Sequence, residues 1–310
     1  SIAGKDLRNC TSQDFGFIVG PRLNAAGRLD DMSVGIECLL ADDMASANQH
    51  AALLDDLNRQ RKDIEGDMLQ QAMKALDEQL KQMQGQPLKA GVSIYNPAWH
   101  QGVVGLVASR LKERYHRPAI AMAPAGDGEL KGSARSISGL HIRDTLDLLA
   151  TQYPQLLQKF GGHAMAAGLT IRRDDFDAFA AAFDKLVSQQ LSENDLQEVL
   201  FSDGELEADE LQLPLAEILR DAGPWGQGFP EPLFEGTFQV VSSRIVGGKH
   251  VKMMLCQKGG GKVEAIAFNQ LDDEPETDLQ WLRILYRLDI NEFRGTRTVQ
   301  LMVVQMQSIV

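Results

Sequence analysis

The stretch KFGGHAMAAGLTI (residues 159–171) places two glycines directly before a histidine, and small and β-branched residues after it. Paired glycines let a backbone adopt positive φ and approach a ligand closely. A histidine beside them can donate a hydrogen bond or a proton to that ligand. The same residues are also typical of a glycine turn before a strand, with a histidine at the surface. The stretch therefore predicts a turn and a strand, and makes Gly161, Gly162 and His163 candidate binding residues.

Outward from this stretch, short β-type segments alternate with helical ones. We expect strands at 91–96, 118–124 and 166–171, and helices at 103–115, 143–158 and 175–190. Such alternation favours an α/β domain. Further along, a short helix at 214–223 precedes five expected strands at 233–246, 250–257, 262–268, 281–292 and 297–309. Five short strands separated by glycine turns predict a small antiparallel barrel of the OB-fold type.

Upstream of the α/β segment, the chain from Asp43 to about Met83 has no proline and one glycine, Gly66. Its apolar residues recur three, four or seven positions apart, which is one stripe of a helix. A helix of about 40 residues is about 60 Å long. This length exceeds what one small domain can cover, so we expect the helix to connect two domains.

Composition restricts the class of protein. The 310 residues carry a net charge of −12, with 44% hydrophobic and 24% charged residues, which is typical of a soluble globular protein. The acidic excess is uneven, because residues 194–310 hold 10 basic and 19 acidic side chains. A local basic groove for nucleic acid is therefore compatible with the total charge. The three cysteines show no metal-ligand spacing and favour a reducing cytoplasm. No apolar run is long enough to cross a bilayer, so we expect no membrane contact.

Three further segments carry candidate anion-binding residues. GPRLNAAGRLDD (20–31) sets Arg22, Asn24 and Arg28 among glycines, and an arginine fork binds phosphate oxygens in pairs. The alternative is a loop before a helix with arginines in surface ion pairs. LKGSARSISG (130–139) clusters Ser133, Arg135 and Ser136 near two glycines. Such a cluster can form a cradle for an oxyanion, and the alternative is an ordinary polar loop.

NPAWHQGVVG (96–105) places His100 at a strand-to-helix junction, where helix N–H groups point outward. The alternative is a buried tryptophan with a capping histidine. The sequence contains none of the common nucleotide-binding, metalloprotease or nucleophile-elbow motifs.

In their order, these motifs resemble the RecJ family, which comprises bacterial single-strand-specific 5′→3′ DNA exonucleases of the DHH phosphoesterase superfamily. The resemblance rests on GPRLNAAGRLDD, the long helix, NPAWHQGVVGLVASRLKERYHRP, KGSARSI, FGGHAMAAG and GPWGQGFPEPLF. It runs from about Phe15 to the C-terminus, and GGH is the hallmark of the family's DHHA1 domain. The family's metal-binding motifs, including Asp-His-His, have no counterpart in this sequence.

The resemblance implies an α/β plus all-β fold in four parts. Residues 1–42 would be the end of a DHH domain, 43–85 a connecting helix, 86–191 the DHHA1 domain, and 192–310 a linker and an OB-like barrel. The full-length enzyme would use Mn²⁺ or Mg²⁺, with no metal bound by this segment. The chain would be its substrate-binding part, inactive alone.

The resemblance also implies roles for residues. Ser133 and Arg135, with Arg22 or Arg28, would bind the 5′-terminal phosphate, and Asn24, His100, Ser136, Gly161 and Gly162 would belong to the same surface. His163 would support catalysis by contacting the phosphate near the scissile bond. Strand positions in the barrel add candidates for single-stranded DNA: Arg244, Lys249, Lys252, Arg283, Tyr286, Phe293 and Arg294.

Single-stranded-DNA-binding protein is the partner that the resemblance implies. Two alternatives stay open. One is a DHH–DHHA1 phosphodiesterase of oligonucleotides or cyclic dinucleotides, although such proteins usually end soon after the GGH segment. The other is a non-catalytic replication scaffold related to RecJ, against which the intact GGH and SAR motifs argue.

Overall fold

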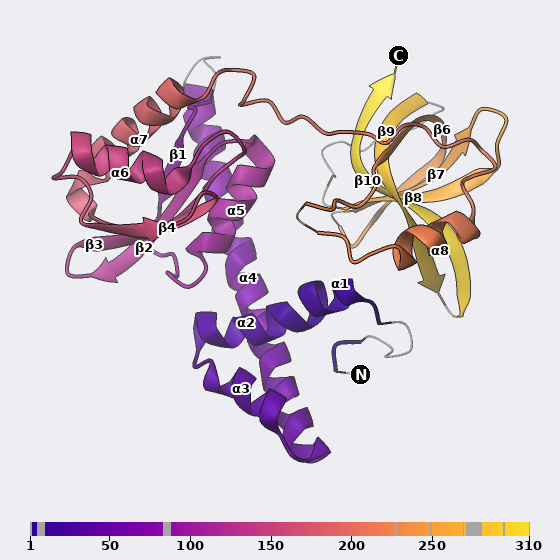
Figure 1. Cartoon of the computed structure of the whole chain (residues 1–310), viewed down its shortest axis with the longest axis horizontal. Coiled ribbons are helices and arrows are strands. Elements are labelled where there is room, and N and C mark those ends of the chain that lie inside the picture. Colours follow the sequence, from indigo (N-terminus) through magenta and orange to yellow (C-terminus); the bar gives the residue numbers. More distant parts are fainter. Residues whose placement is uncertain are drawn as a thin grey trace. The chain divides into compact units, whose positions relative to one another are not determined.

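The computed structural model describes residues 2–4, 10–82, 88–226, 228–248, 250–268, 270, 281–293 and 295–309. The chain forms two compact units, Ser1–Glu198 and Val199–Val310 (Figure 1). The first combines helices with a mixed sheet, and the second is built around a barrel. The expected combination of an α/β unit and an all-β unit is confirmed.

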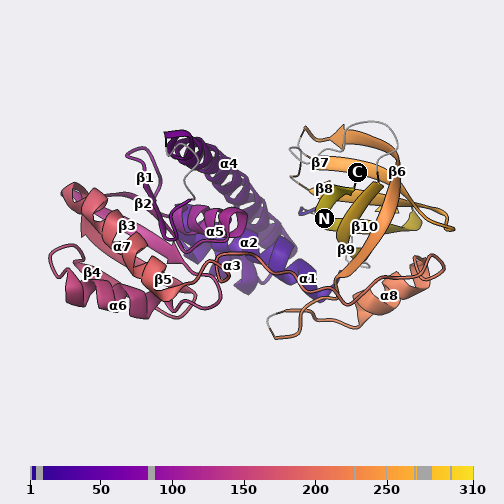
Figure 2. The same ribbon diagram turned by 90° about the horizontal axis from the view of Figure 1, so that it is seen from above.

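The first unit is organised along the long helix α4 (Met44–Gln82), close to its expected bounds. Helices α2 (Gly20–Leu29) and α3 (Ser33–Leu40) pack against its N-terminal half, after a short α1 (Ser12–Asp14) and a π-helical turn (Phe15–Val19). Ala25 and Ala26 of α2 are fully buried against Leu54 and Leu57 of α4. Figure 2 shows α4 as a single rod that continues from these helices past α5.

A five-stranded sheet forms the rest of the first unit. Its strands are β1 (Val92–Tyr95), β2 (Ala119–Gly126), β3 (Glu129–Arg135), β4 (Lys159–Gly162) and β5 (Ala166–Arg172), in the order β1-β2-β3-β5-β4. The β1–β2 pair is parallel and the other pairs are antiparallel. Strands β3 and β4 lie where the sequence predicts a polar loop and a glycine turn.

Helices cover the sheet on two faces. On one face, α6 (Ile142–Gln152) and α7 (Phe176–Gln190) bury Ile120, Leu130 and Leu169 with their neighbours. On the other face, α5 (Val104–Tyr115) and α4 bury Ala119 and Ala121. Helix α5 contacts β2 and β3, so on the same face of the sheet it does not extend over β5 and β4. The exposed glycines Gly168 and Gly161 pair there with each other, next to Ser133 of β3.

The second unit is a closed five-stranded barrel, as the sequence predicts. Its strands are β6 (Phe234–Val246), β7 (His250–Gln257), β8 (Lys262–Phe268), β9 (Trp281–Phe293) and β10 (Thr296–Ile309), closed in the order β10-β8-β7-β6-β9. The β8–β10 pair is parallel, and the other pairs are antiparallel. Helix α8 (Leu213–Asp221) packs its buried Ala216 against this barrel.

Within the described segments, none of the helices combines the length and apolar character needed to span a membrane.

Candidate nucleic-acid interface

A hollow of about 400 Å³ lies where α2, the start of α5, β3 and β5 meet in the first unit. Three basic side chains line it: Arg28 from α2, and Lys131 and Arg135 from β3. No aspartate or glutamate is among its lining residues, all of which the structure describes. The hollow is therefore a concentration of positive charge without a neutralising carboxylate. We call it the cationic pocket.

The alternation of β3 explains why Arg135 reaches this pocket. Leu130, Gly132 and Ala134 face the core, so Lys131, Ser133 and Arg135 face the side of α5. Arg135 Nη1 donates to Ser133 Oγ at 2.8 Å and to the carbonyl of Ala134 at 2.9 Å. Its Nε donates to Ser109 Oγ of α5 at 3.1 Å. Neutral acceptors thus fix the guanidinium without cancelling its charge.

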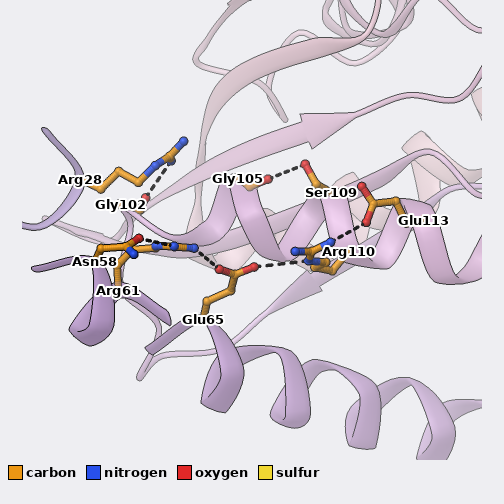
Figure 3. Close-up of polar contacts among 9 residues, drawn as sticks. All are labelled: Arg28, Asn58, Arg61, Glu65, Gly102, Gly105, Ser109, Arg110 and Glu113. Atoms are coloured by element: carbon orange, nitrogen blue, oxygen red, sulfur yellow. Dashed lines mark hydrogen bonds and ion pairs between the residues drawn. The ribbon is translucent and has the colours of Figure 1, made fainter. Parts of the chain in front are cut away.

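Arg28 brings a second guanidinium to the pocket from a segment more than 100 residues earlier. Its Nη1 reaches the carbonyl of Gly102 at 3.4 Å, at the long end of hydrogen-bond distances (Figure 3). Burial, and then the charge of Arg28, lower the pKa of Arg135. The two cations therefore repel each other in the free protein, and an anion between them would relieve that repulsion.

Two glycines make this close arrangement possible. A Cβ at Gly102 would lie 2.2 Å from the carbonyl oxygen of Arg28, so α2 approaches α5 closely at this point. A Cβ at Gly105 would lie 3.0 Å from Arg135 Nη2 and 3.1 Å from Ser133 Oγ. Gly105 is also in the first turn of α5, where backbone N–H groups lack intrahelical acceptors and favour anions.

The structure separates the two arginines of GPRLNAAGR. Arg22 Nε donates to Asp55 Oδ1 of α4 at 2.8 Å, and its Nη1 donates to the carbonyl of Ile18 at 2.7 Å. It is an ion-paired residue of the α2–α4 packing and does not line the pocket. The exposed Asn24 does not line it either. Of the pair "Arg22 or Arg28", the geometry supports Arg28.

Two other predicted residues have structural roles. Ser136 is 1% exposed, and its Oγ donates to the carbonyl of Leu140, so its hydroxyl cannot contact a ligand. This corrects its placement in the phosphate cradle. His100 Nδ1 accepts from the N–H of Gly102 at 3.1 Å, and the buried Trp99 donates to Gln71. His100 shapes the turn that holds Gly102.

The GGH segment lies at the free edge of the same sheet, on β4. Gly162 has a φ of +153°, and a Cβ there would lie 2.4 Å from the carbonyl oxygen of Ala166, so glycine is required. A Cβ at Gly161 would meet no heavy atom within 4 Å, so this position is open to a ligand. The exposed His163 follows them. None of the three lines the cationic pocket.

In the barrel, a second groove of about 830 Å³ contains Arg244, Lys252 and Lys262. Arg244 and Lys262 are exposed, whereas Lys252 Nζ lies 3.1 Å from Glu264 Oε2. Arg283 lies in another groove, with Leu200 and Phe201, and is hydrogen-bonded to Glu235. The structure therefore brings Arg244 and Lys252 together and places Arg283 elsewhere.

Tyr286 belongs to the barrel core, which corrects the expectation that it faces DNA. Its side chain is 0% exposed and packs edge-on against Phe238, with ring centroids 5.8 Å apart. Burial raises the pKa of its phenol. Lys249, Arg294 and the side chain of Phe293 lie outside the described part of the chain.

Five residues of these sites were not singled out from the sequence: Gly102, Gly105, Ser109, Lys131 and Lys262. Lys131 and Gly105 had a signal, since each lies inside a quoted motif, and the period-two alternation of ELKGSAR marks Lys131 as facing the same way as Arg135. Ser109 had none, because its role depends on the packing of α5 against β3.

A buried polar network fixes α5 against α4. Glu65 of α4 accepts from Arg61 at 2.5 Å and from Arg110 of α5 at 3.4 Å, and Arg61 also donates to Asn58 (Figure 3). The side chains of Arg61 and Glu65 are each 11% exposed. Because Gly105 and Ser109 lie in the first two turns of α5 and Gly102 lies just before it, this network helps set the position of the pocket wall.

Two family models match the chain, the DHHA1 domain over residues 88–189 and the RecJ OB domain over residues 202–305. The chain is 52% identical over 305 residues to the single-stranded-DNA-specific exonuclease RecJ of Dickeya dadantii, covering 97% of this chain and 52% of that protein. The chain thus matches the DHHA1 and OB domains of RecJ.

A crystal structure of RecJ from Thermus thermophilus in complex with Mg²⁺ superposes with a TM-score of 0.74 and 26% identity, covering 95% of this chain and 43% of that chain. The Mn²⁺ complex of the same protein gives a TM-score of 0.73 at 27% identity, covering 95% of this chain and 41% of that one. The chain thus spans about half the length of the curated RecJ relatives it matches. The RecJ OB match beyond the GGH segment favours RecJ over the shorter phosphodiesterases.

Those two crystal structures carry a metal ion, whereas the described residues of this chain hold no group of three or more His, Cys, Asp or Glu side chains suited to one.

Proposed function

We propose that the chain is the substrate-binding part of a RecJ-type exonuclease that degrades single-stranded DNA 5′→3′ in recombination and repair, in the cytoplasm. Its cationic pocket would bind the 5′-terminal phosphate. The relatives named as single-stranded-DNA-specific exonucleases support the substrate class. The observation that carries the proposal is the meeting of Arg28, Lys131 and Arg135 without a carboxylate.

A terminal phosphate suits this pocket better than an internal one. A terminal monoester carries a charge of about −1.5 to −2 at pH 7 and three acceptor oxygens, whereas an internal diester carries a single charge. Two guanidiniums in mutual repulsion gain most from a dianion. Ser133 Oγ accepts from Arg135, which leaves its O–H to donate to a phosphate oxygen.

His163 would contact the strand farther from its end. It is exposed directly after the edge strand β4, beyond the open backbone of Gly161 and outside the cationic pocket. A strand whose end lies in the pocket would therefore cross Gly168 and Gly161, which pair on the uncovered face of the sheet. This position agrees with a contact to a phosphate near the scissile bond.

The barrel would bind the single strand through the groove that holds Arg244, Lys252 and Lys262. OB folds bind single strands by combining backbone electrostatics with base stacking. His250 packs against Phe268 in the same unit, with ring centroids 4.8 Å apart, and Phe268 is 44% exposed. This pair offers an apolar face to a base.

Arg135→Ala tests the phosphate site. The 310-residue chain is titrated against two fluorescent single strands that differ only in a 5′ phosphate. Loss of one charge-assisted contact of about 1.5–3 kcal/mol should weaken binding of the phosphorylated strand about 10- to 150-fold. Binding of the 5′-hydroxyl strand should change little.

Two variants complete the test. Arg28→Ala should also lower the preference for the 5′ phosphate, whereas Arg22→Ala should lower the melting temperature and leave the preference intact. Equal losses on both strands for Arg135→Ala would remove it from the phosphate site.

The metal-dependent cleavage would require residues beyond those described, with Mn²⁺ or Mg²⁺ as the ion. We expect the 310-residue chain alone to release no mononucleotides from 5′-labelled single-stranded DNA with Mn²⁺. Metal-dependent release that persists through purification of the chain and disappears in an Arg135→Ala preparation would contradict this.

The same proposal includes single-stranded-DNA-binding protein as a partner, which the family resemblance supports. Binding of the chain to that protein with and without its C-terminal tail tests the contact, and equal binding to both forms would argue against a tail-mediated one.

A further inference from the structure

Ser109 of α5 has two hydrogen bonds with different consequences. Its Oγ donates to the carbonyl of Gly105, one turn earlier, at 3.0 Å, and accepts from Arg135 Nε at 3.1 Å. The first bond stays within the helix. The second crosses from α5 to β3 and reaches the residue that carries the proposed phosphate contact.

The second bond occupies one of the N–H donors of Arg135. A guanidinium has five N–H donors: one on Nε, two on Nη1 and two on Nη2. Ser109 takes the Nε donor, and Ser133 Oγ and the Ala134 carbonyl take those of Nη1. Among the described contacts, the two donors of Nη2 have no acceptor. Nη2 lies above Gly105, at the wall of the cationic pocket.

We infer that Ser109 is a positioning residue for phosphate recognition, because it fixes Nε of the Arg135 guanidinium and thereby holds Nη2 at the wall of the pocket. This inference rests on the proposed phosphate site. A serine suits the task because its hydroxyl is neutral. A carboxylate at this place would hold the arginine equally well and would cancel the charge that attracts phosphate.

The alternative is a serine that merely satisfies its own hydroxyl within a helix, and the chain offers a matched example. Ser188 of α7 donates to the carbonyl of Asp184 at 2.9 Å, with the same four-residue spacing, and is exposed. No arginine donates to it among the described hydrogen bonds. Ser188→Ala therefore removes the intrahelical bond alone, whereas Ser109→Ala also removes the acceptor of Arg135.

The experiment measures the preference of the 310-residue chain for a 5′-phosphorylated over a 5′-hydroxyl single strand, as the ratio of two dissociation constants. Ser109→Ala should lower this ratio about 3- to 10-fold, the effect of one hydrogen bond, while Ser188→Ala leaves it unchanged. Ser109→Thr keeps a hydroxyl with the same acceptor and should restore the ratio. The melting temperature should fall more in Ser109→Ala than in Ser188→Ala, because only Ser109→Ala also removes the acceptor of Arg135 Nε.

The double variant Ser109→Ala/Arg135→Ala decides whether Ser109 acts through Arg135. In that background the serine substitution should have no further effect on the ratio, which a purely structural role would not produce. If Ser109→Ala keeps the wild-type ratio while Arg135→Ala abolishes the preference for the 5′ phosphate, the inference about Ser109 is wrong. The proposed phosphate site would then remain supported. An unchanged ratio in Arg135→Ala would overturn the phosphate site, and the inference with it.

Discussion

Gly105 determines where the guanidinium of Arg135 lies, because a side chain at residue 105 would occupy the same space. The first Cβ contact there is the far end of a flexible side chain, so alanine can be accommodated if Arg135 moves. The glycine therefore preserves a position of Arg135 rather than a backbone conformation. Recognition and stability can be separated at this one residue.

We predict that Gly105→Ala lowers the preference for a 5′-phosphorylated strand about tenfold, because displaced Nη2 donors lose most of a contact of about 1.5–3 kcal/mol. The free energy of unfolding should change by less than about 1 kcal/mol, since alanine favours helices. Paired titrations and chemical denaturation measure the two quantities. Gly66→Ala on α4 is the control, because its Cβ would meet no atom within 4 Å. A full preference in Gly105→Ala would show that the guanidinium does not need that space.

The pH dependence of binding should follow the ionisation of the 5′-terminal phosphate, because the arginines do not change their charge over the same range. Arginine stays protonated throughout the range from pH 5 to 7.5, even though burial and Arg28 lower the pKa of Arg135. A lowered pKa would in any case favour proton loss as pH rises, which weakens anion binding. The second pKa of a terminal phosphate is about 6, so about one tenth of it is dianionic at pH 5.

We therefore predict that the preference for the 5′ phosphate rises about tenfold from pH 5 to pH 7.5. Titrations of both strands at constant ionic strength check this, with the 5′-hydroxyl strand as the control. A preference that falls with rising pH would point to a histidine as the main contact, because histidine loses its charge over this range.

For individual residues, the sequence predicted which types of side chain form the site better than it predicted where each side chain lies. Ser133 and Arg135 share one face of β3 and line the pocket, since residues two apart on a strand point the same way. Ser136, one step further, faces the interior for the same reason. Arg22 and Arg28 were equivalent in the sequence, and Asp55 of α4, which distinguishes them, is 33 residues away from Arg22.

At the level of elements, ion pairs that are separate from the pocket link α4 to α5, in addition to the apolar packing between the two helices. Glu65 accepts from Arg61 on its own helix and from Arg110 on α5. Arg61 has little exposure, so loss of the carboxylate would leave a cation in a largely dry place with Asn58 as its acceptor. Removing one partner of a buried pair costs more than the pair contributes.

We predict that Glu65→Ala lowers the free energy of unfolding of the first unit by about 3 kcal/mol. Glu113→Ala removes an exposed partner of the same Arg110 and should cost less than about 1 kcal/mol. Chemical denaturation followed by circular dichroism compares the two variants. A similar loss in both would mean that burial adds nothing to the Glu65 contacts.

Element types were predictable where the apolar period was strong and were missed where glycine and serine dominate. The stripe of α4 and the strands of the barrel gave bounds close to those observed. KGSAR reads as a loop by composition, yet it is a central strand. It pairs with β2, which directly precedes it in the chain, and with β5, which begins 31 residues after Arg135. The glycines of β4 likewise serve edge pairing with β5.

For the whole molecule, the distribution of ion pairs limits how DNA is held. In the barrel unit, Lys252, Arg283, Arg287 and Arg297 each lie within 4.0 Å of a glutamate oxygen. Among the described contacts, ion pairs are absent for the pocket cations Arg28, Lys131 and Arg135 and for Arg244 and Lys262 of the barrel groove. A net charge of −12 is therefore compatible with a restricted set of about five phosphate contacts.

We predict that the chain binds single-stranded DNA in preference to duplex, and that its affinity falls steeply as the salt concentration rises. About five phosphate contacts give a slope of about −3 to −4 for the logarithm of the binding constant against that of the salt concentration. Anisotropy titrations from low to physiological salt, on a single strand and its blunt duplex, measure both quantities. Equal affinities, or a slope steeper than about −6, would show that the ion-paired cations also contact DNA.

The long helix α4 has one more consequence, which concerns angle and spacing rather than contact. Asp55 anchors α2 through Arg22, and Glu65 anchors α5 through Arg110, so the two walls of the pocket are attached to one rod ten residues apart. That interval is about 15 Å and a little under three turns. One residue inserted between the anchors would turn α5 by about 100° relative to α2 and separate Arg28 from Arg135 without altering either wall. The stretch from Asp55 to Glu65 thus sets both the distance and the angle between the two walls of a pocket to which none of its residues belongs.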